Sequence, residues 1–142
     1  MKFFKYNFFL LKDLPSAFFC GTRIKSIDEK QCEIKIRLNW FNKNPFKSMF
    51  WAAQGMAAEL TTALMLKDKI EKTGYDVSML MISNKANYYK KATGTIIFKC
   101  NQGNEIDNII NELISSQAPQ TILLSSAGIN NNHVVVSKFT FE

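Results

Sequence analysis

The sequence has few of the side chains on which most enzyme chemistry depends. Among its 142 residues there is a single histidine, His133, which excludes mechanisms that need a pair of imidazoles. The three cysteines are odd in number and widely spaced, so the chain offers neither a disulfide framework nor a Cys-x-x-Cys metal knuckle. We interpret Cys20, Cys32 and Cys100 as reduced thiols of a cytoplasmic protein, and we expect no bound metal.

Long runs of like charge are also missing. Eighteen Lys and Arg stand against twelve Asp and Glu, and the first fifty residues hold ten basic and four acidic side chains. This gradient is compatible with nucleic acid, an anionic membrane surface or a phosphate-bearing ligand. Because no five like charges are consecutive, scattered solubilising lysines are the simpler explanation, and we do not expect nucleic-acid binding.

Length and composition predict one domain spanning residues 1–142, since 46% apolar residues suffice for one core. Residues 1–20 are expected to form an N-terminal helix and lead-in. The helix would run from about Lys5 to Lys12, break at Leu14-Pro15 and dock through its phenylalanines. Charged residues interrupt the apolar run of this segment, which argues against a secretion signal.

Alternating apolar residues and turn signals predict six strands and one further amphipathic helix. The expected order is helix, two strands, long helix, two strands, helix, two strands. We expect a hairpin over 22–39, strands over 77–89 and 94–100, a helix over 104–117, and strands over 120–127 and 133–141.

The long helix is the most informative element. From Ser48 to Leu66 the chain reads SMFWAAQGMAAELTTALML, nineteen residues with one charged side chain, Glu59. We predict a helix over 48–73, with Ser48 as its N-cap and Gly74 as its stop. Polar residues in its middle, and the lack of a second such run, argue against a membrane span. The remaining interpretation is a helix buried nearly all round by its own protein.

An antiparallel sheet that wraps around this helix would reconcile six strands with one apolar helix. The order resembles the hot-dog fold, an α+β fold in which a curved sheet of about six strands encloses a long central helix and two subunits usually pair. FWAAQGMAAELTTA lies where hot-dog thioesterases of the phenylacetate and 4-hydroxybenzoyl type begin their helix with His-Gly-Gly and carry an acidic residue about nine positions later. Counting back nine residues from Glu59 reaches Phe50, which stands where these thioesterases have the histidine of the motif. Trp51 and Ala52 stand where they have its two glycines.

Two further strings extend the resemblance. NYYKKATGTI resembles a strand, basic bulge and Gly-led strand of the same superfamily, with Lys90 and Lys91 at the bend. The run from LPSAFFCGTRI to NWFNKNPFKSMFWAAQGMAAEL resembles a bacterial hot-dog family of unknown function that is described as thioesterase-like, and the likeness extends from about Leu14 to the end. The chain departs from the thioesterase motif because it lacks His-Gly-Gly, so loss of catalysis is an open alternative.

The resemblance implies an acyl-CoA thioesterase that acts as a homodimer, or as a tetramer, with coenzyme A as part of the substrate and no separate cofactor. Glu59 would be the nucleophile or the general base that activates water. Backbone amides of Phe50, Trp51 and Ala52 would stabilise the oxyanion. The residues expected to contact substrate are Asn42, Asn44, Gln54, Lys90 and Lys91.

Simpler roles stay open for these residues. A lone carboxylate in an apolar helix must be hydrogen-bonded, ligated or protonated, so Glu59 could instead pair with an Asn or a backbone amide at a dimer seam. The lysines could be solvated turn residues, and Asn44 could simply belong to an Asn-Pro turn. The second hypothesis for the whole chain is therefore a non-catalytic hot-dog module that binds acyl groups or lipids.

Overall fold

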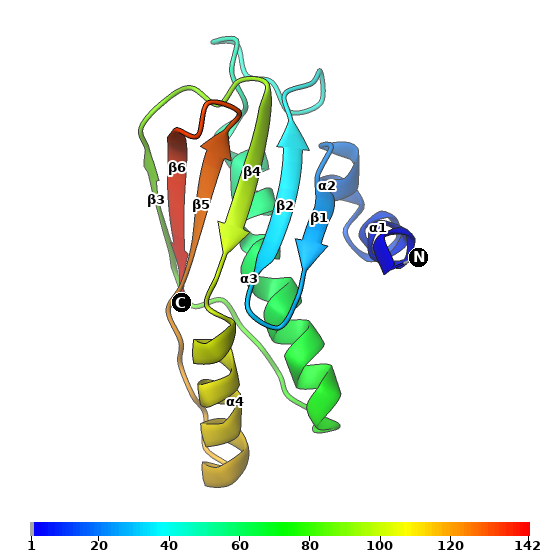
Figure 1. Ribbon diagram of the computed structural model, residues 1–142, viewed down its shortest axis with the longest axis vertical. Coiled ribbons are helices and arrows are strands. Elements are labelled where there is room, and N and C mark those ends of the chain that lie inside the picture. Colours follow the sequence, from blue (N-terminus) through cyan, green and yellow to red (C-terminus); the bar gives the residue numbers. More distant parts are fainter. Residues whose placement is uncertain (1) are drawn as a thin grey trace.

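The computed structural model describes residues 2–142, with side chains from residue 4 onward. One antiparallel sheet of six strands curves around a long helix (Figure 1). In chain order the elements are α1 (Lys2–Asp13), α2 (Pro15–Phe19), β1 (Arg23–Ile27), β2 (Cys32–Arg37), α3 (Trp51–Thr73), β3 (Asn84–Tyr88), β4 (Thr95–Cys100), α4 (Gly103–Ser116), β5 (Leu124–Asn130) and β6 (Val135–Phe141).

The spatial order of the strands is β1-β2-β4-β5-β6-β3, so β1 and β3 form the two edges. Alternate residues of the central strands face α3, as in β2, where Cys32, Ile34 and Ile36 are fully buried. Against them α3 presents small residues such as Ala57 and Ala58, which allow the sheet to lie close to the helix. The expected sheet wrapped around one helix is confirmed.

The start of α3 differs from the sequence prediction. The helix begins at Trp51 with Phe50 as its N-cap residue, and no side chain caps it. Ser48 lies three residues before the helix, and its Oγ accepts from Asn44 Nδ2 at 3.1 Å, inside the preceding loop. The predicted stop is confirmed, since Gly74 adopts φ 74°, a conformation that glycine accepts without strain.

The predicted strand over 77–89 is also shorter in the structure. Only β3 joins the sheet, while residues 77–83 run extended outside it and are tied to the C-terminus by the Ile82 N–H, which donates to Glu142 O at 2.8 Å. Their mixed apolar sequence covers α3 rather than a sheet face. A short apolar run such as residues 79–82 suits both arrangements, and this is why the sequence did not separate them.

Helix α1 docks differently from the prediction. Its contact with the domain is made by Leu10, which is fully buried, with Tyr6 and Phe9 packed beside it. Phe4 and Phe8 are exposed, so docking through all the phenylalanines is wrong. The helix lies beyond β1 and covers that edge of the sheet (Figure 1).

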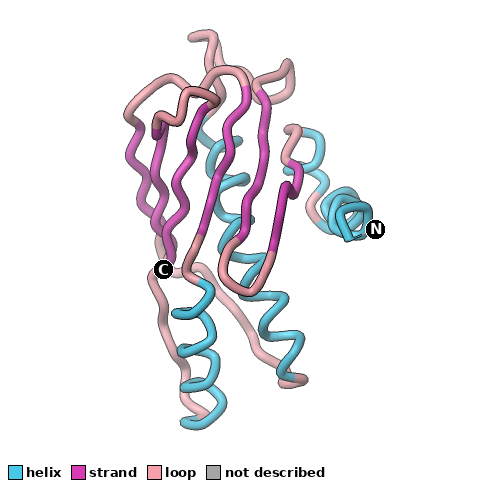
Figure 2. The backbone as a smooth tube through the Cα atoms, in the orientation of Figure 1, coloured by secondary structure: helices cyan, strands magenta, loops and turns pink. Residues whose placement is uncertain are grey.

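Helix α4 lies beside the C-terminal half of α3, and both extend beyond the end of the sheet (Figure 2). The buried ammonium of Lys69 on α3 lies 2.7 Å from Asp107 Oδ1 on α4 and 3.5 Å from Glu29 Oε2 in the β1–β2 turn. Gly103 starts α4 so close to that turn that a Cβ atom would lie 2.1 Å from Glu29 O. These contacts fix the space between α3 and α4.

Within the described residues, no helix is long and apolar enough to cross a bilayer.

Candidate functional site

One face of α3 turns away from the sheet and carries Glu59. Five residues share this face because they follow one another at helical spacing. They are Glu59, Thr62, Ala63, Leu66 and Ile70.

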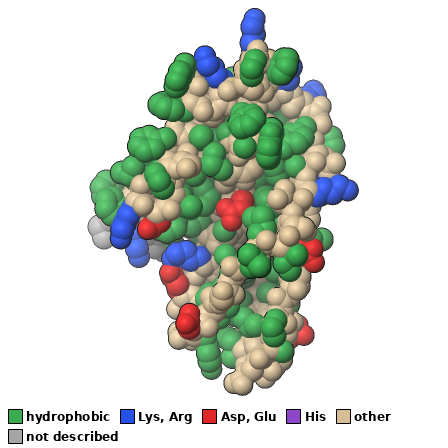
Figure 3. All heavy atoms as spheres, turned by 180° about the vertical axis from the view of Figure 1, so that it is seen from behind, with side chains coloured by type: hydrophobic (Ala, Val, Ile, Leu, Met, Phe, Trp, Pro, Cys, Tyr) green, Lys and Arg blue, Asp and Glu red, His purple; other side chains and the backbone are tan. Residues whose placement is uncertain are grey.

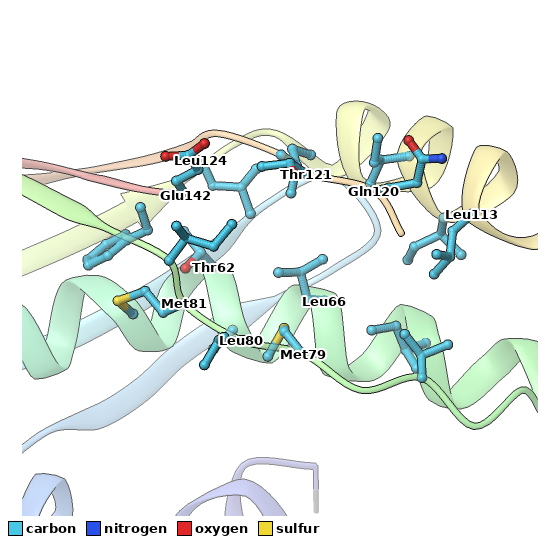
Figure 4. A pocket seen from close by; sticks show the side chains of 18 of the residues that line it. Thr62, Leu66, Met79, Leu80, Met81, Leu113, Gln120, Thr121, Leu124 and Glu142 are labelled. Atoms are coloured by element: carbon cyan, nitrogen blue, oxygen red, sulfur yellow. The ribbon is translucent and has the colours of Figure 1, made fainter. Parts of the chain in front are cut away.

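This face forms one wall of a cavity of about 390 Å³ (Figure 4), a volume within the range of small-molecule sites. The second wall is the extended segment 77–82, the third is α4 with Ile109, Ile110 and Leu113, and the fourth is segment 119–124. In Figure 4, Leu66 of α3 and Leu113 of α4 lie on opposite sides of the cavity, with Leu80 and Met81 crossing in front of α3. The lining is mainly apolar and suits a hydrocarbon chain.

Glu59 is the functional group at this cavity. Its side chain is half-buried, and burial raises the pKa of its carboxyl group. No hydrogen bond or ion pair within the described part of the chain involves this carboxylate. Figure 3 shows acidic side-chain atoms in the middle of a face made largely of hydrophobic side chains. A carboxylate without a partner is available to a ligand or a water molecule.

A second, more open hollow of about 520 Å³ lies at the start of α3. It brings together six of the residues that the sequence singled out, which are Asn44, Phe50, Trp51, Gln54, Lys90 and Lys91. Ala52 follows in the same helical turn. Asn42 and Glu59 do not line this hollow.

Within the described chain, the free donors at this helix start include the backbone amides of Trp51 and Ala52. A first helical turn has no intrahelical acceptor for its N–H groups, and no acidic side chain stands in this one. The Phe50 N–H is engaged, because it donates to Asn42 O at 2.7 Å. Phe50 could therefore bind an oxyanion only by giving up that bond.

The expected amide side chains already have partners within the chain. Asn42 is buried, and its Nδ2 donates to Cys20 O and Arg37 O, both at 2.8 Å. Gln54 Nε2 donates to Met49 O at 3.2 Å, and Gln54 Oε1 accepts from Ser137 Oγ at 2.9 Å. Both groups hold the walls of the site in place, and substrate contact by them stays a prediction.

Glu59 and the free amides are too far apart to act together in one subunit. Eight residues separate Trp51 from Glu59, about 12 Å along a helix. The free N–H groups also point out of the helix start, away from Glu59. A general base must reach its proton directly or through one water, so one carbonyl cannot contact both groups of the same α3.

Sequence reasoning missed most of the cavity lining. Leu66 and Ile70 could have been found, since they follow Glu59 at positions i+7 and i+11. The walls at 77–82 and 119–124 carry no comparable local signal.

These features agree with a family match. The model of a domain of unknown function, DUF4442, matches residues 11–136. The chain belongs to this family. The likeness to a hot-dog thioesterase-like family of unknown function is thereby confirmed. No curated protein matches this DUF4442 protein.

Solved structures share its fold. A Chlorobaculum tepidum protein of unknown function is 20% identical with a TM-score of 0.82, over 96% of this chain and 89% of its own. A Pseudomonas aeruginosa protein called a probable thioesterase is 15% identical with a TM-score of 0.75, over 97% and 91%. A Haemophilus influenzae thioesterase is 10% identical with a TM-score of 0.68, over 99% and 87%. Identities this low establish the hot-dog fold alone.

Proposed function

We propose that this DUF4442 protein hydrolyses acyl thioesters, with acyl-CoA as the substrate and Glu59 as the general base. The observation that carries the proposal is a half-buried carboxylate, free of partners in the described chain, at the wall of an apolar cavity. Solved structures of the same fold that are named thioesterases support it.

In the proposed reaction, ionised Glu59 takes a proton from a water molecule while the water oxygen attacks the thioester carbonyl carbon. The carbonyl oxygen becomes an oxyanion, and it collapses as the carbon–sulfur bond breaks. The leaving thiolate takes the proton from Glu59, which releases a free thiol and a carboxylic acid. The raised pKa of Glu59 makes it a stronger base than an ordinary glutamate.

Stabilisation of the oxyanion is assigned to the Trp51 and Ala52 amides at the positive end of the α3 dipole. The acyl chain would lie in the cavity beside Glu59, and coenzyme A would extend from the hollow at the start of α3. Lys90 and Lys91 line that hollow and are exposed, which suits contact with the phosphates of coenzyme A.

The separation of Glu59 from the amides requires a second copy of the chain. Two antiparallel α3 helices related by a two-fold axis would place Glu59 of each copy near the helix start of the other. The available surface is the β3 edge and the segment before it, where Leu80 is 83% and Ile82 62% exposed. We therefore propose a cytoplasmic homodimer with two shared sites.

A second candidate function is a non-catalytic module that binds acyl groups. The specific observation in its favour is that Trp51 and Ala52 replace the two glycines of the thioesterase motif, which narrows backbone approach to the helix start. The apolar cavity would serve either function.

The test is thiol release from acyl-CoA substrates that range from acetyl to palmitoyl. We expect the native protein to be active and Glu59→Gln to lose about 10²-fold or more, the usual contribution of a general base. Glu71→Gln, at an exposed glutamate of the same helix, is the matched control and should keep full activity. Full activity of Glu59→Gln would contradict the proposal, and tight acyl-CoA binding by an inactive native protein would favour the module.

A further inference from the structure

The loop between β2 and α3 has the reverse of the usual distribution of polar and apolar side chains. Its asparagines turn inward, as with Asn42, which is 1% exposed. Its aromatic residues turn outward: Trp40 is 72%, Phe41 65% and Phe46 72% exposed. We call these three residues the aromatic tip. Loops usually expose polar groups and bury aromatic ones, so this arrangement calls for an explanation.

The exposure does not come from a loosely held loop. Between Lys43 and Met49 the chain forms a small hairpin, with the Asn44 N–H donating to Ser48 O at 2.8 Å. The Met49 N–H donates to Ala92 O at 2.8 Å, and Lys91 Nζ donates to Phe46 O at 3.1 Å. These bonds tie the loop to the bend between β3 and β4, so the aromatic tip is held outward.

The aromatic tip lies at one end of the molecule and has little cover of its own. The loop projects beyond the strands, on the side where α3 begins (Figure 1). The Trp40 and Phe41 rings pack edge to face with centroids 5.3 Å apart, and Lys43 Nζ lies 5.8 Å from the Trp40 ring. Neighbouring exposed aromatic side chains of this kind are typical of a binding surface.

The charged groups around the aromatic tip have one sign. Lys43 and Lys47 stand on the same loop, and Lys90 and Lys91 stand on the adjoining bend, all exposed. The sequence has no acidic residue from 34 to 58 or from 77 to 104. Figure 3 shows Lys and Arg atoms interspersed with hydrophobic side chains at this end.

Exposed aromatic side chains surrounded by lysines indicate what kind of partner binds the aromatic tip. A second copy of the chain would bring like charges together, which disfavours self-association through the aromatic tip. Trp and Phe side chains are stable at the boundary between lipid headgroups and acyl chains, and nearby lysines attract anionic headgroups. We propose that the aromatic tip and the two lysines of its loop, Lys43 and Lys47, dock the protein on the surface of a bilayer that contains anionic lipid.

The experiment is co-sedimentation of the native protein with vesicles of phosphatidylcholine, with and without about one third phosphatidylglycerol. The apolar variant is Trp40→Ser/Phe41→Ser/Phe46→Ser, and its control is Tyr75→Ser/Leu123→Ser, at residues 59% and 60% exposed and outside this loop. The charge variant is Lys43→Glu/Lys47→Glu, and its control is Lys35→Glu/Lys138→Glu, at two exposed strand residues. Circular dichroism melts show whether each variant is folded.

We expect binding to the anionic vesicles only. Loss of one positive charge near an anionic surface costs about fivefold in binding. Because Lys→Glu also adds a negative charge, each substitution of the charge variant should weaken binding more than fivefold. The apolar variant should weaken binding more than tenfold, with both controls unchanged. No binding by the native protein, equal binding to neutral vesicles, or binding that survives in the folded variants would overturn the proposal. Retention on polyglutamate resin without vesicle binding would also overturn it, in favour of an acidic protein partner.

Discussion

The two edges of the sheet are treated in opposite ways. At the β1 edge the chain supplies its own cover, because α1 packs against β1 with Leu10 fully buried. At the β3 edge no element of the described chain packs on the outer side of the strand. The residues of β3 are exposed, except for the half-buried Ala86. An uncovered edge offers unpaired backbone groups to another strand. The difference indicates which edge is available to a second copy of the protein.

The open edge is continuous with the candidate site. Segment 77–82 lines the cavity beside Glu59 and leads directly into β3. Surface that would join two subunits therefore also shapes the place where an acyl chain would lie. The covered edge has no comparable link, since no residue of α1 or β1 lines the cavity.

The largest effect is expected from charges on the open edge. Leu80→Asp/Ile82→Asp places four carboxylates across the proposed two-fold interface, so we expect a monomer with no measurable thioesterase activity. Light scattering after size exclusion gives the mass. The matched variant at the covered edge is Phe4→Asp/Phe8→Asp, also at exposed apolar residues, and it should remain a dimer. A dimeric Leu80→Asp/Ile82→Asp protein would remove segment 77–82 from the interface.

Removing one oxyanion donor is expected to have the next largest effect. Trp51→Pro deletes the amide N–H at the first helical position, where proline is tolerated, and Phe50 already has the extended ψ of 138° that a following proline requires. We expect kcat to fall about 10²-fold. Trp51→Ala keeps the amide and controls for the lost ring. Equal rates for the two variants would exclude this amide from the reaction.

A substitution at the covered β1 edge should lower the stability of the protein instead of its activity. Leu10→Ala removes a fully buried side chain between α1 and the domain, and we expect a loss of about 2–5 kcal/mol in the free energy of unfolding. Leu11→Ala, at a residue 41% exposed, should change it by less than about 1 kcal/mol. Urea titrations measure both. If folded Leu10→Ala dissociates into monomers without denaturant, the two edges are not independent.

The smallest effect concerns pH. Because burial raises the pKa of Glu59, the folded protein holds this proton more tightly than the unfolded chain does. The contribution of Glu59 to stability therefore falls as pH rises from the ordinary pKa of glutamate through the raised one, and it stays low above that window. Urea unfolding at several pH values, in the monomeric Leu80→Asp/Ile82→Asp background, should show this fall. This fall in the free energy of unfolding should be absent when Glu59→Gln is added to the same background. Identical pH profiles with and without Glu59→Gln would contradict the raised pKa of Glu59.

Most of the fold could be predicted from sequence because its signals are local. Alternation at Cys32, Ile34 and Ile36 and helical spacing in 104–117 each identify an element without reference to the rest of the chain. The N-cap at Ser48 was wrong because Ser48 Oγ accepts from Asn44 Nδ2 in a loop that delays the helix to Trp51. The strand from Val77 was too long because a short apolar run looks the same in sequence whether the extended segment covers a helix or joins a sheet.

The candidate site was only partly predictable for a similar reason. Glu59 could be singled out because it is the one charge in nineteen residues. Its cavity could not, since the walls come from segments 77–82, 109–113 and 119–124, which are brought together only by folding. Exposure of the aromatic tip also depends on bonds to distant backbone, such as Asn42 to Cys20 O.

The central claim is that each site combines Glu59 of one subunit with the helix-start amides of the other. The most direct test is to unfold and refold Glu59→Gln and Trp51→Pro together and to assay the mixture. Half of the dimers would then be mixed, and each mixed dimer would hold one intact site. The account predicts recovery of about a quarter of native activity from two inactive proteins. Activity no higher than that of the separate variants, with mixed dimers shown to be present, would contradict it.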